Sequence, residues 1–355
     1  MKILLVTFSD NADHQDTLFG LYEELSKSED VYLLAIDAPK VPITKTKRTW
    51  LVNCPKRPGI CKGTFNLPLL FRLIYRIRRE QFDVIYFESL HTWNLPIMAL
   101  CGRKVHTYQV IHEVIPHEGD SQVKMVDLMN KAVCLLANTV VLRNQTYIDE
   151  MLKRYKISVE RVKFLELWRR YPVYTEPQYT GRVLFFGRIN PYKGADNLLE
   201  IVRLCPEIQF DVIGRVDPQM EYIAEQLARE PNVKLNNEYV SDDDMREAFI
   251  QADWVIVPYN SASQSGIIID AYKYSRPVIA FDVGAIAEQV EDGLSGYLIA
   301  AGDNEAFAKR LRLAISMGTI AFHELSENAY HYGYGKYAVE QSAKRFKQLV
   351  RGNSQ

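Results

Sequence analysis

The chain has 355 residues, 47% of them hydrophobic, and a formal net charge of −1 at pH 7. This length suits two domains rather than one, and the hydrophobic content allows each domain its own core. A net charge near zero argues against bulk binding of nucleic acid. The five cysteines form no C-x-x-C pair, which argues against zinc fingers and favours a reducing compartment.

The amino terminus runs directly into a predicted strand, without the charged and apolar regions of a signal peptide. No apolar run reaches the roughly 18 residues that a membrane-spanning helix requires. We therefore expect a cytoplasmic protein. A peripheral position on the inner face of the plasma membrane is a further expectation, which rests on a basic segment at residues 40–79.

The amino-terminal half alternates strand-like and helix-like patterns. Buried strands are predicted at residues 2–8, 31–36, 84–87, 105–111 and 139–142, and helices at residues 18–25, 69–79 and 123–137. This alternation predicts a parallel, doubly wound sheet.

A one-sided charge run lies within this half, because residues 38–79 contain no Asp or Glu but eleven Lys and Arg. On the predicted helix, Arg72, Arg76 and Arg79 share an outer face opposite an apolar stripe. One interpretation of the run is a solvated basic surface. The other is a surface that binds anionic lipid headgroups or a polyprenyl-diphosphate-linked acceptor, and near an anionic membrane each cation contributes roughly 1 kcal/mol to binding. Both interpretations stay open, and an anionic membrane surface is an expected partner of residues 40–79.

Two histidines, His112 and His117, follow the predicted strand at residues 105–111. They are five residues apart with Pro116 between them, which excludes the H-E-x-x-H zinc motif, whose histidines lie four apart on one helical face. His112 is expected at the carboxyl end of the strand, and we favour it over His117 as a catalytic candidate. The alternative for either residue is a structural histidine whose ring nitrogens are satisfied.

Residues 167–180 contain two prolines and no periodic pattern, which predicts a hinge between two domains. A new alternation begins at Val183, where the stretch VLFFGRINPYKG predicts a strand, a turn at Gly187, the cations Arg188 and Lys193, and a helix start. A guanidinium and an ammonium beside a helix start can hold a diphosphate. The alternative is an ordinary turn with two solvated charges.

A second segment of the same kind begins at Trp254. The buried pattern WVIVPY leads into a polar loop, and Ser265 and Gly266 then precede a helix. Ligands of doubly wound sheets bind at the carboxyl ends of the strands. Gly266 and Ile267 can offer free backbone N–H groups to phosphate, and Asp270 can accept hydrogen bonds from vicinal hydroxyls such as those of a ribose. The alternative for Asp270 is a carboxylate that merely favours the start of its helix.

These motifs together resemble a known family. The succession FGRINPYKG, PY and SASQSGIIIDAYKYSRPVIAFDVGAIAEQVEDGLSGYLI is similar to the carboxy-terminal domain of family-four retaining glycosyltransferases, also called group 1 glycosyltransferases, which have the GT-B fold. The similarity covers roughly residues 182–299. It implies that Arg188 and Lys193 grip the diphosphate of a nucleotide-sugar and that the amides of Gly266 and Ile267 add to this grip.

The same resemblance implies that Asp270 takes the ribose hydroxyls and that His112 lies close to the donor sugar. Gly284 and Glu288 fall on the family's Gly-x-x-x-Glu element, and we expect no direct role for Glu288. No metal and no cofactor are expected, and the donor is expected to be UDP- or GDP-linked. The predicted donor-binding residues are Gly187, Arg188, Lys193, Gln264, Ser265, Gly266, Ile267 and Asp270, and the catalytic candidates are His112, Arg188 and Lys193.

Two departures from the family pattern affect the expected chemistry. The family usually carries two glutamates separated by seven residues, but here the second is Asp270 and the first position is Ala262. Either Gln264 or a serine takes over recognition of the sugar hydroxyls, or activity is weakened or lost. After the first strand the family often has adjacent glycines, where this chain has SDNADHQD.

The sequence therefore predicts an α/β protein with the GT-B fold, in which two Rossmann-like, doubly wound parallel-sheet domains face a central cleft. We expect an acceptor domain at residues 1–170, a nucleotide-sugar-binding domain at residues 171–334, and a last helix at about 335–355 that packs back on the first domain.

The predicted function is metal-independent, retaining transfer of a hexose from a nucleotide-diphosphate sugar to a glycan or lipid-linked acceptor, in cell-surface polysaccharide or glycoconjugate synthesis. A catalytically silent GT-B partner subunit and a nucleotide-sugar epimerase on the same fold remain as alternatives. A dinucleotide oxidoreductase is disfavoured, because no G-x-G-x-x-G follows the first strand.

Overall fold

The computed structural model describes residues 1–102, 104–115 and 123–352, so His117 lies outside the described residues. The chain divides into two compact units. Unit 1 comprises Met1–Arg169 and Val339–Gln355, and unit 2 comprises Arg170–Ala338.

Unit 1 contains a seven-stranded parallel sheet in the order β3-β2-β1-β4-β5-β6-β7. The strands are β1 (Lys2–Thr7), β2 (Asp30–Ile36), β3 (Thr49–Val52), β4 (Val84–Phe87), β5 (His106–Ile111), β6 (Thr139–Leu142) and β7 (Val162–Phe164). The helices are α1 (Ala12–Ser26), α2 (Leu67–Glu80), α3 (Asn94–Cys101), α4 (Val123–Leu136), α5 (Ile148–Tyr155) and α12 (Val339–Gly352), with 3₁₀ turns η1 (Lys62–Phe65) and η2 (Val159–Arg161).

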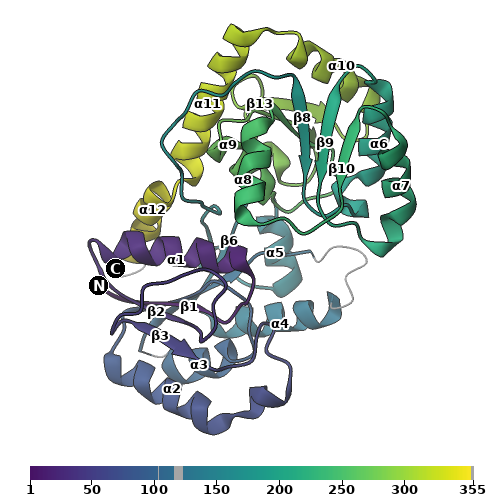
Figure 1. The fold of residues 1–355 in the computed structure, drawn as a ribbon. Helices are drawn as coiled ribbons and strands as arrows, with labels where there is room; N and C mark the ends of the chain where they lie inside the picture. The colour runs from purple at the N-terminus through teal and green to yellow at the C-terminus, as the bar shows by residue number, and fades with distance from the viewer. Residues whose placement is uncertain (103, 116–122, 353–355) are drawn as a thin grey trace. The chain divides into compact units, whose positions relative to one another are not determined.

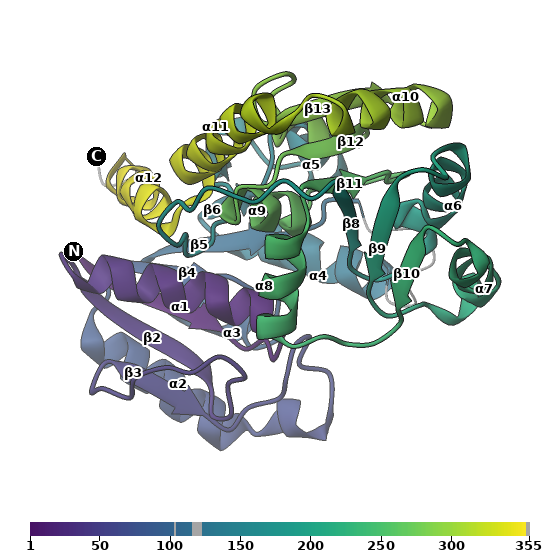
Figure 2. The same ribbon diagram turned by 45° about the horizontal axis from the view of Figure 1, so that its top comes forward.

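Two helical layers cover this sheet, because successive strand side chains point to opposite faces. Ile3 and Leu5 of β1 belong to the core under α1 and α12, whereas Leu4 and Val6 belong to the core under α2 and α3. Helix α4 continues the second layer, since it contacts α3 and packs on Val140, a strand residue on that same face. Figures 1 and 2 show the layer of α1 and α12 and the opposite layer of α2 and α3.

The last helix, α12, belongs to the core of unit 1. It is separated from α11 (Thr319–Tyr337) by Ala338, whose extended backbone (φ −66°, ψ 140°) ends the preceding helix. Its buried residues at 339, 343, 346 and 350 follow the spacing of an amphipathic helix. Phe346 meets Tyr86 edge-on, with ring centroids 5.1 Å apart.

Unit 2 contains a six-stranded parallel sheet in the order β10-β9-β8-β11-β12-β13. The strands are β8 (Arg182–Phe186), β9 (Gln209–Ile213), β10 (Val233–Asn236), β11 (Trp254–Val257), β12 (Val278–Asp282) and β13 (Gly296–Ala300). Besides α11, the helices are α6 (Ala195–Leu204), α7 (Glu221–Arg229), α8 (Asp242–Gln251), α9 (Gly266–Lys273) and α10 (Asn304–Ile315), with 3₁₀ turns η3 (Pro191–Lys193), η4 (Pro218–Met220) and η5 (Ile286–Glu288).

Both sheets have the doubly wound order, in which the chain winds outward from a central pair of strands, so the predicted fold class of two Rossmann-like domains is confirmed. The central pair is β1 and β4 in unit 1 and β8 and β11 in unit 2. The direction of winding reverses between these strands, and ligands in this class of fold bind at the carboxyl ends of the strands at such a switch point.

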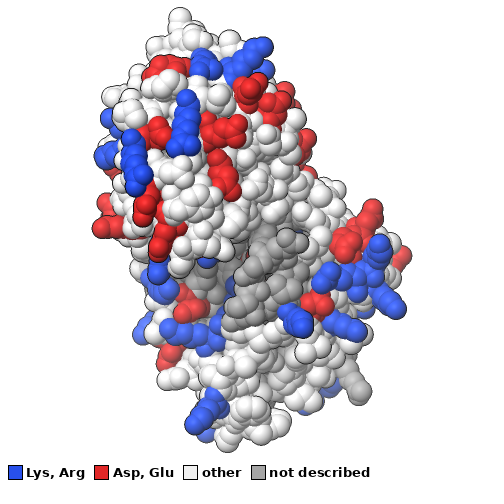
Figure 3. All heavy atoms as spheres, turned by 90° about the vertical axis from the view of Figure 1, so that its right-hand side faces the viewer, with Lys and Arg blue, Asp and Glu red and all other residues white. Residues whose placement is uncertain are grey.

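The surface shown in Figure 3 carries charged side chains of both signs, interspersed rather than segregated. Within the described residues, no helix combines the length and the apolar character needed to cross a membrane.

The buried His91 of unit 1 is held in its neutral form. Nε2 of His91 donates to the carbonyl oxygen of Pro55 at 2.9 Å, because a carbonyl oxygen can only accept a hydrogen bond. The backbone N–H of Trp93 donates to Nδ1 of His91 at 3.0 Å. Protonation of Nδ1 would break the second hydrogen bond. Burial accordingly lowers the pKa of His91 to about 4, although the hydrogen bond to Pro55 opposes the shift.

We predict that the free energy of unfolding falls as the pH is lowered from 6.5 to about 4, by about 3 kcal/mol from His91 alone. The sign follows because the unfolded chain binds a proton at His91 in this pH range and the folded chain does not. Urea unfolding at a series of pH values measures the slope. In His91→Gln the free energy of unfolding should depend less on pH, even if the variant is less stable at every pH. An unchanged pH dependence in this variant would contradict a lowered pKa for His91.

Candidate functional site

The turn after β8 places the ammonium of Lys193 against the backbone of Gly187. Gly187 has a left-handed φ of +112°, and its N–H donates to the carbonyl of Ile213 at 2.9 Å, which extends the β8–β9 ladder by one residue. A Cβ atom on Gly187 would lie 2.2 Å from Nζ of Lys193, so any other residue would displace the ammonium. The ammonium also lies 5.4 Å from the ring centroid of the buried Tyr259. Glycine at 187 therefore allows a cation to sit at the end of the central strand.

A second glycine locks the loop after β8 to the loop after β11. Gly194 has φ +70°, and a Cβ there would lie 1.8 Å from the carbonyl oxygen of Pro258. The N–H of Asn260 donates to the carbonyl of Tyr192 at 2.9 Å, and its side-chain amide donates to Pro191 at 2.9 Å. The loops after β8 and β11, at the switch point of the sheet, are therefore hydrogen-bonded to each other.

The N-terminus of α9 lies beside the lysine. Ser265 is buried, and its backbone is clamped by Gln289, whose Oε1 accepts from the Ser265 N–H at 2.6 Å and whose Nε2 donates to the Ser265 carbonyl at 3.0 Å. The next two residues, Gly266 and Ile267, are half-buried and contribute N–H groups of the first helical turn, which lack partners within the helix. Cδ1 of Ile267 would lie 3.9 Å from a Cβ on Gly187. The ammonium of Lys193 and the positive end of α9 therefore converge on the end of β8.

The other predicted donor-site residues occupy the same edge of unit 2. Arg188 is exposed immediately after Gly187, and Gln264 is half-buried immediately before Ser265. Asp270 is buried in α9, one turn after Gly266. Ala262, where the resembled family has its first glutamate, is buried, and its carbonyl accepts from the Ala285 N–H at 3.1 Å. Glu288, for which we expect no direct role, lies in η5, and its backbone carbonyl accepts a hydrogen bond from the Lys336 ammonium.

The predicted catalytic histidine belongs to unit 1 and lies in a buried polar cluster. His112 follows β5, and its Nε2 donates to the carbonyl oxygen of Glu88 at 2.8 Å and lies 3.4 Å from Oε1 of Glu88. The carboxylate of Glu88 pairs with the guanidinium of Arg143, and both side chains are fully buried. The ring of His14 stacks on His112, with centroids 4.6 Å apart. The cluster therefore gathers at the carboxyl ends of β4, β5 and β6.

The sequence patterns did not indicate Glu88, Arg143 or His14. The available signal was position, because Glu88 and Arg143 each directly follow a buried strand, where a charged residue is unusual unless it has a role. Gln289 gave no such signal, since it lies 24 residues from the Ser265 backbone that it clamps.

Burial and neighbouring charges act in opposite directions on this cluster. Burial alone would raise the pKa of Glu88, but the Arg143 guanidinium and His112 more than offset this and the net pKa is lowered. Burial, together with repulsion from His112 and nearby arginines, lowers the pKa of His14 well below its usual value. Glu88 is therefore an anion, and His14 a neutral ring, at neutral pH.

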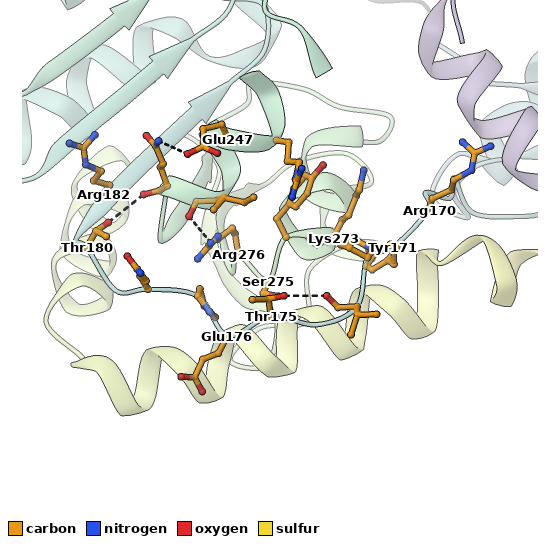
Figure 4. A pocket seen from close by; sticks show the side chains of 18 residues that line it. Arg170, Tyr171, Thr175, Glu176, Thr180, Arg182, Glu247, Lys273, Ser275 and Arg276 are labelled. Atoms are coloured by element: carbon orange, nitrogen blue, oxygen red, sulfur yellow. Dashed lines mark hydrogen bonds between the residues drawn. The ribbon is translucent and has the colours of Figure 1, made fainter. Parts of the chain in front are cut away.

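A separate hollow of about 950 Å³ lies at the opposite edge of unit 2, near the amino ends of β8 and β12 (Figure 4). Its lining includes Arg182, Lys273 and Arg276. The Arg276 guanidinium donates to the carbonyls of Phe249 and Ile250 at 2.8 and 2.7 Å and so closes the carboxyl end of α8. Burial lowers the pKa of Arg276 to about 10. This hollow is not part of the candidate site.

Part of the sequence matches a known family. Residues 180–316 match the family described as "Glycosyl transferases group 1". A GDP-mannose:glycolipid 4-beta-D-mannosyltransferase of Xanthomonas campestris pv. campestris is 32% identical over 120 residues, which cover 32% of this chain and 34% of that protein. A D-inositol 3-phosphate glycosyltransferase of Mycolicibacterium gilvum is 29% identical over 136 residues, which cover 36% of this chain and 30% of that protein. The matched stretches thus span about a third of the length of these relatives.

Solved structures are similar over the whole chain. HepE of Anabaena, in complex with UDP and glucose, has a TM-score of 0.73 at 18% identity and covers 99% of both chains. Sucrose-phosphate synthase of Thermosynechococcus elongatus has a TM-score of 0.71 at 16% identity, again over 99% of both chains. These similarities establish the fold, and together with the family match they support the predicted resemblance to GT-B glycosyltransferases.

We predict that Gln289→Ala lowers the free energy of unfolding by about 1–3 kcal/mol, because it leaves the buried N–H and carbonyl of Ser265 without partners. The control is Gln251→Ala, which removes an exposed side chain whose amide donates to Glu247 at 2.7 Å and should change stability by about 0.5 kcal/mol or less. Urea unfolding measures both. Equal small effects would show that Gln289 does not hold the start of α9.

Proposed function

We propose that this chain is a retaining glycosyltransferase of family four. It transfers a sugar from a nucleotide-diphosphate sugar, UDP- or GDP-linked, to a glycan or lipid-linked acceptor, in the cytoplasm and without a metal ion. The observation that carries the proposal is the convergence of Lys193 and the N-terminus of α9 on Gly187 at the switch point of unit 2. The name of one relative, a GDP-mannose:glycolipid mannosyltransferase, agrees with this class of donor and acceptor, and that of the other, a D-inositol 3-phosphate glycosyltransferase, agrees with glycosyl transfer.

In this proposal the residues of unit 2 bind the leaving group. The Lys193 ammonium, the exposed Arg188 guanidinium and the amides of Gly266 and Ile267 surround the diphosphate, because each supplies positive charge or a hydrogen-bond donor. Asp270, one helical turn further on, accepts hydrogen bonds from the ribose diol. Anchoring the diphosphate stabilises the negative charge that develops as the sugar departs, which is the role that a metal ion plays in other transferases.

In this proposal His112 acts near the donor sugar, and Glu88 orients its ring. Glu88 fixes its ring through Nε2, and Arg143 fixes Glu88 through a buried ion pair. A held imidazole can donate or accept a hydrogen bond with a sugar hydroxyl at a defined place. Gln264 is the proposed replacement for the missing glutamate at Ala262, since it is the partly accessible polar side chain directly beside Ser265.

A thermal-shift screen of the purified chain against UDP, GDP, ADP and TDP, and their sugars, tests donor binding. Transfer assays with the stabilising donor then test turnover, and NMR of the product tests retention at the anomeric carbon. Undiminished transfer in the presence of EDTA is expected. Binding without transfer would instead favour a catalytically silent partner subunit, an alternative that rests on the absence of a carboxylate at Ala262.

Lys193→Ala and Arg188→Ala should each weaken binding of the nucleotide diphosphate by about 1.5–3 kcal/mol, because each removes a charge-assisted hydrogen bond. Calorimetry measures the affinity. Lys234→Ala, which removes an exposed cation on β10 of the same unit, is the control and should leave the affinity unchanged. Unchanged affinity in both test variants would refute the phosphate site.

Asp270→Asn should weaken binding of the ribonucleotide but have little effect on the 2′,3′-dideoxy form, because only the ribonucleotide loses a charged acceptor for its hydroxyls. Calorimetry with both ligands gives the difference. Since Asp270 is buried, circular dichroism should first establish that the variant is folded. Equal losses for both ligands would make Asp270 a structural residue.

A further inference from the structure

The two helical layers of unit 1 differ in the apolar surface that they expose. In the described part of unit 1, large exposed hydrophobic side chains occur on α2, α3 and α4 and in the segments next to them, with one more, Val159, in η2. Helices α1 and α12 expose none. Scattered exposed hydrophobic residues need no explanation, but a concentration on one layer marks a contact surface.

Helix α2 carries this surface as two parallel stripes. Its buried residues, Leu70, Leu73, Ile74 and Ile77, face the sheet. On the outer side, Leu67, Phe71 and Tyr75 follow one another at four-residue intervals and are 49%, 58% and 68% exposed. Arg72 and Arg79 are exposed beside them. At 100° per residue, the apolar stripe and the cationic stripe lie next to each other on the outer face.

The cations of this layer are not balanced by acids. Helix α2 contains one acidic residue, Glu80, which is paired with Lys2 at 2.6 Å, and α4 contains one, Asp127, which is paired with Arg154 at 2.7 Å. Helix α3 contains none. Arg76 differs from its neighbours, because its guanidinium stacks on the buried Trp50 at 3.8 Å and helps to cover the core.

Helix α4 repeats the combination on the same layer. Lys124, Leu128, Lys131 and Leu135 are all exposed and follow a spacing of four, three and four residues, which places them on one helical face. Apolar and basic side chains therefore occur together on neighbouring helices of this layer.

We propose that the layer of α2, α3 and α4 docks on a bilayer that contains anionic phospholipid. Leu67, Phe71 and Tyr75 enter the interfacial region, where aromatic side chains are favoured, and Arg72 and Arg79 pair with the lipid phosphates. The surplus of positive charge beside the aromatic stripe selects this occupant over a second copy of the chain, whose matching face would carry the same charge. The proposal is independent of sugar transfer, although docking would bring a transferase to a lipid-linked acceptor.

Co-sedimentation of the full chain with liposomes tests the proposal, with zwitterionic lipid alone and with increasing anionic lipid. Association should need the anionic lipid and should weaken as added salt shortens the Debye length from about 10 Å at 0.1 M. Arg72→Gln with Arg79→Gln should reduce the affinity about 30-fold, at roughly 1 kcal/mol for each cation and 1.4 kcal/mol for each factor of ten. Arg76 stays unchanged, because it covers Trp50.

Phe71→Ser with Tyr75→Ser should reduce the affinity by roughly tenfold or more, even at low salt, because it removes the inserting side chains. The matched control is Tyr239→Ser with Ile320→Ser, which removes two side chains of unit 2 that are each 87% exposed. Association that ignores lipid charge, or that falls equally in the control, would overturn the proposal. So would a change of oligomeric state in the α2 variants without lipid, which would assign the stripe to contact between copies.

These assays need no donor sugar, so their outcome is separate from that of the proposed function. Loss of lipid binding in the variants with normal transfer to a water-soluble acceptor would support docking and leave the transferase proposal intact.

Discussion

The candidate site of unit 2 depends on close backbone approach at the carboxyl ends of two adjacent parallel strands. Gly187 and Gly194 both adopt left-handed conformations, and a side chain at either would overlap the Lys193 ammonium or the Pro258 carbonyl. Without these glycines the loops after β8 and β11 would separate. The lysine and the N-terminus of α9 would then no longer share one position. The sheet supplies the location, and the absence of two Cβ atoms lets positive charge concentrate there.

In unit 1 a buried ion pair, Glu88 and Arg143, orients a histidine rather than concentrating positive charge. Removing two charges from water is costly, so burial of the Glu88–Arg143 pair is weak evidence that the pair stabilises the fold. What it provides is orientation, because Arg143 holds the carboxylate, and Glu88 holds His112 through its backbone and side chain. A rigid, charged support beneath a histidine at strand ends is typical of sites where ring direction matters.

The sequence allowed the fold and the loops of unit 2 to be predicted, because fully buried strands and glycine-bounded turns are local signals. Strand β3 was not predicted, because it lies in a basic, proline-containing segment and only one of its four residues is buried. Helices α3 and α5, of eight residues each and without a capping side chain, were also not predicted. Partners from distant segments also gave no pattern, as with Gln289 and Ser265 or Arg143 and Glu88. The arginines of α2 were recognised from the missing acids, but the exposure of Phe71 and Tyr75 depends on which face the sheet covers.

If unit 2 binds a nucleotide-diphosphate sugar as proposed, its arrangement favours a departing diphosphate over an intact donor. Negative charge on the phosphate next to the sugar grows as the glycosidic bond breaks, so a cation fixed at that point interacts more strongly with the transition state than with the ground state. The backbone N–H of Lys193 donates to Oδ1 of Asn190 at 3.0 Å, which fixes the turn that carries the lysine. Gln289 holds the Ser265 backbone at the start of α9, the helix end with about half a positive charge. In the proposed transfer, such a site would stabilise the leaving group without a strong base, and the acceptor hydroxyl would need only a hydrogen bond when it attacks.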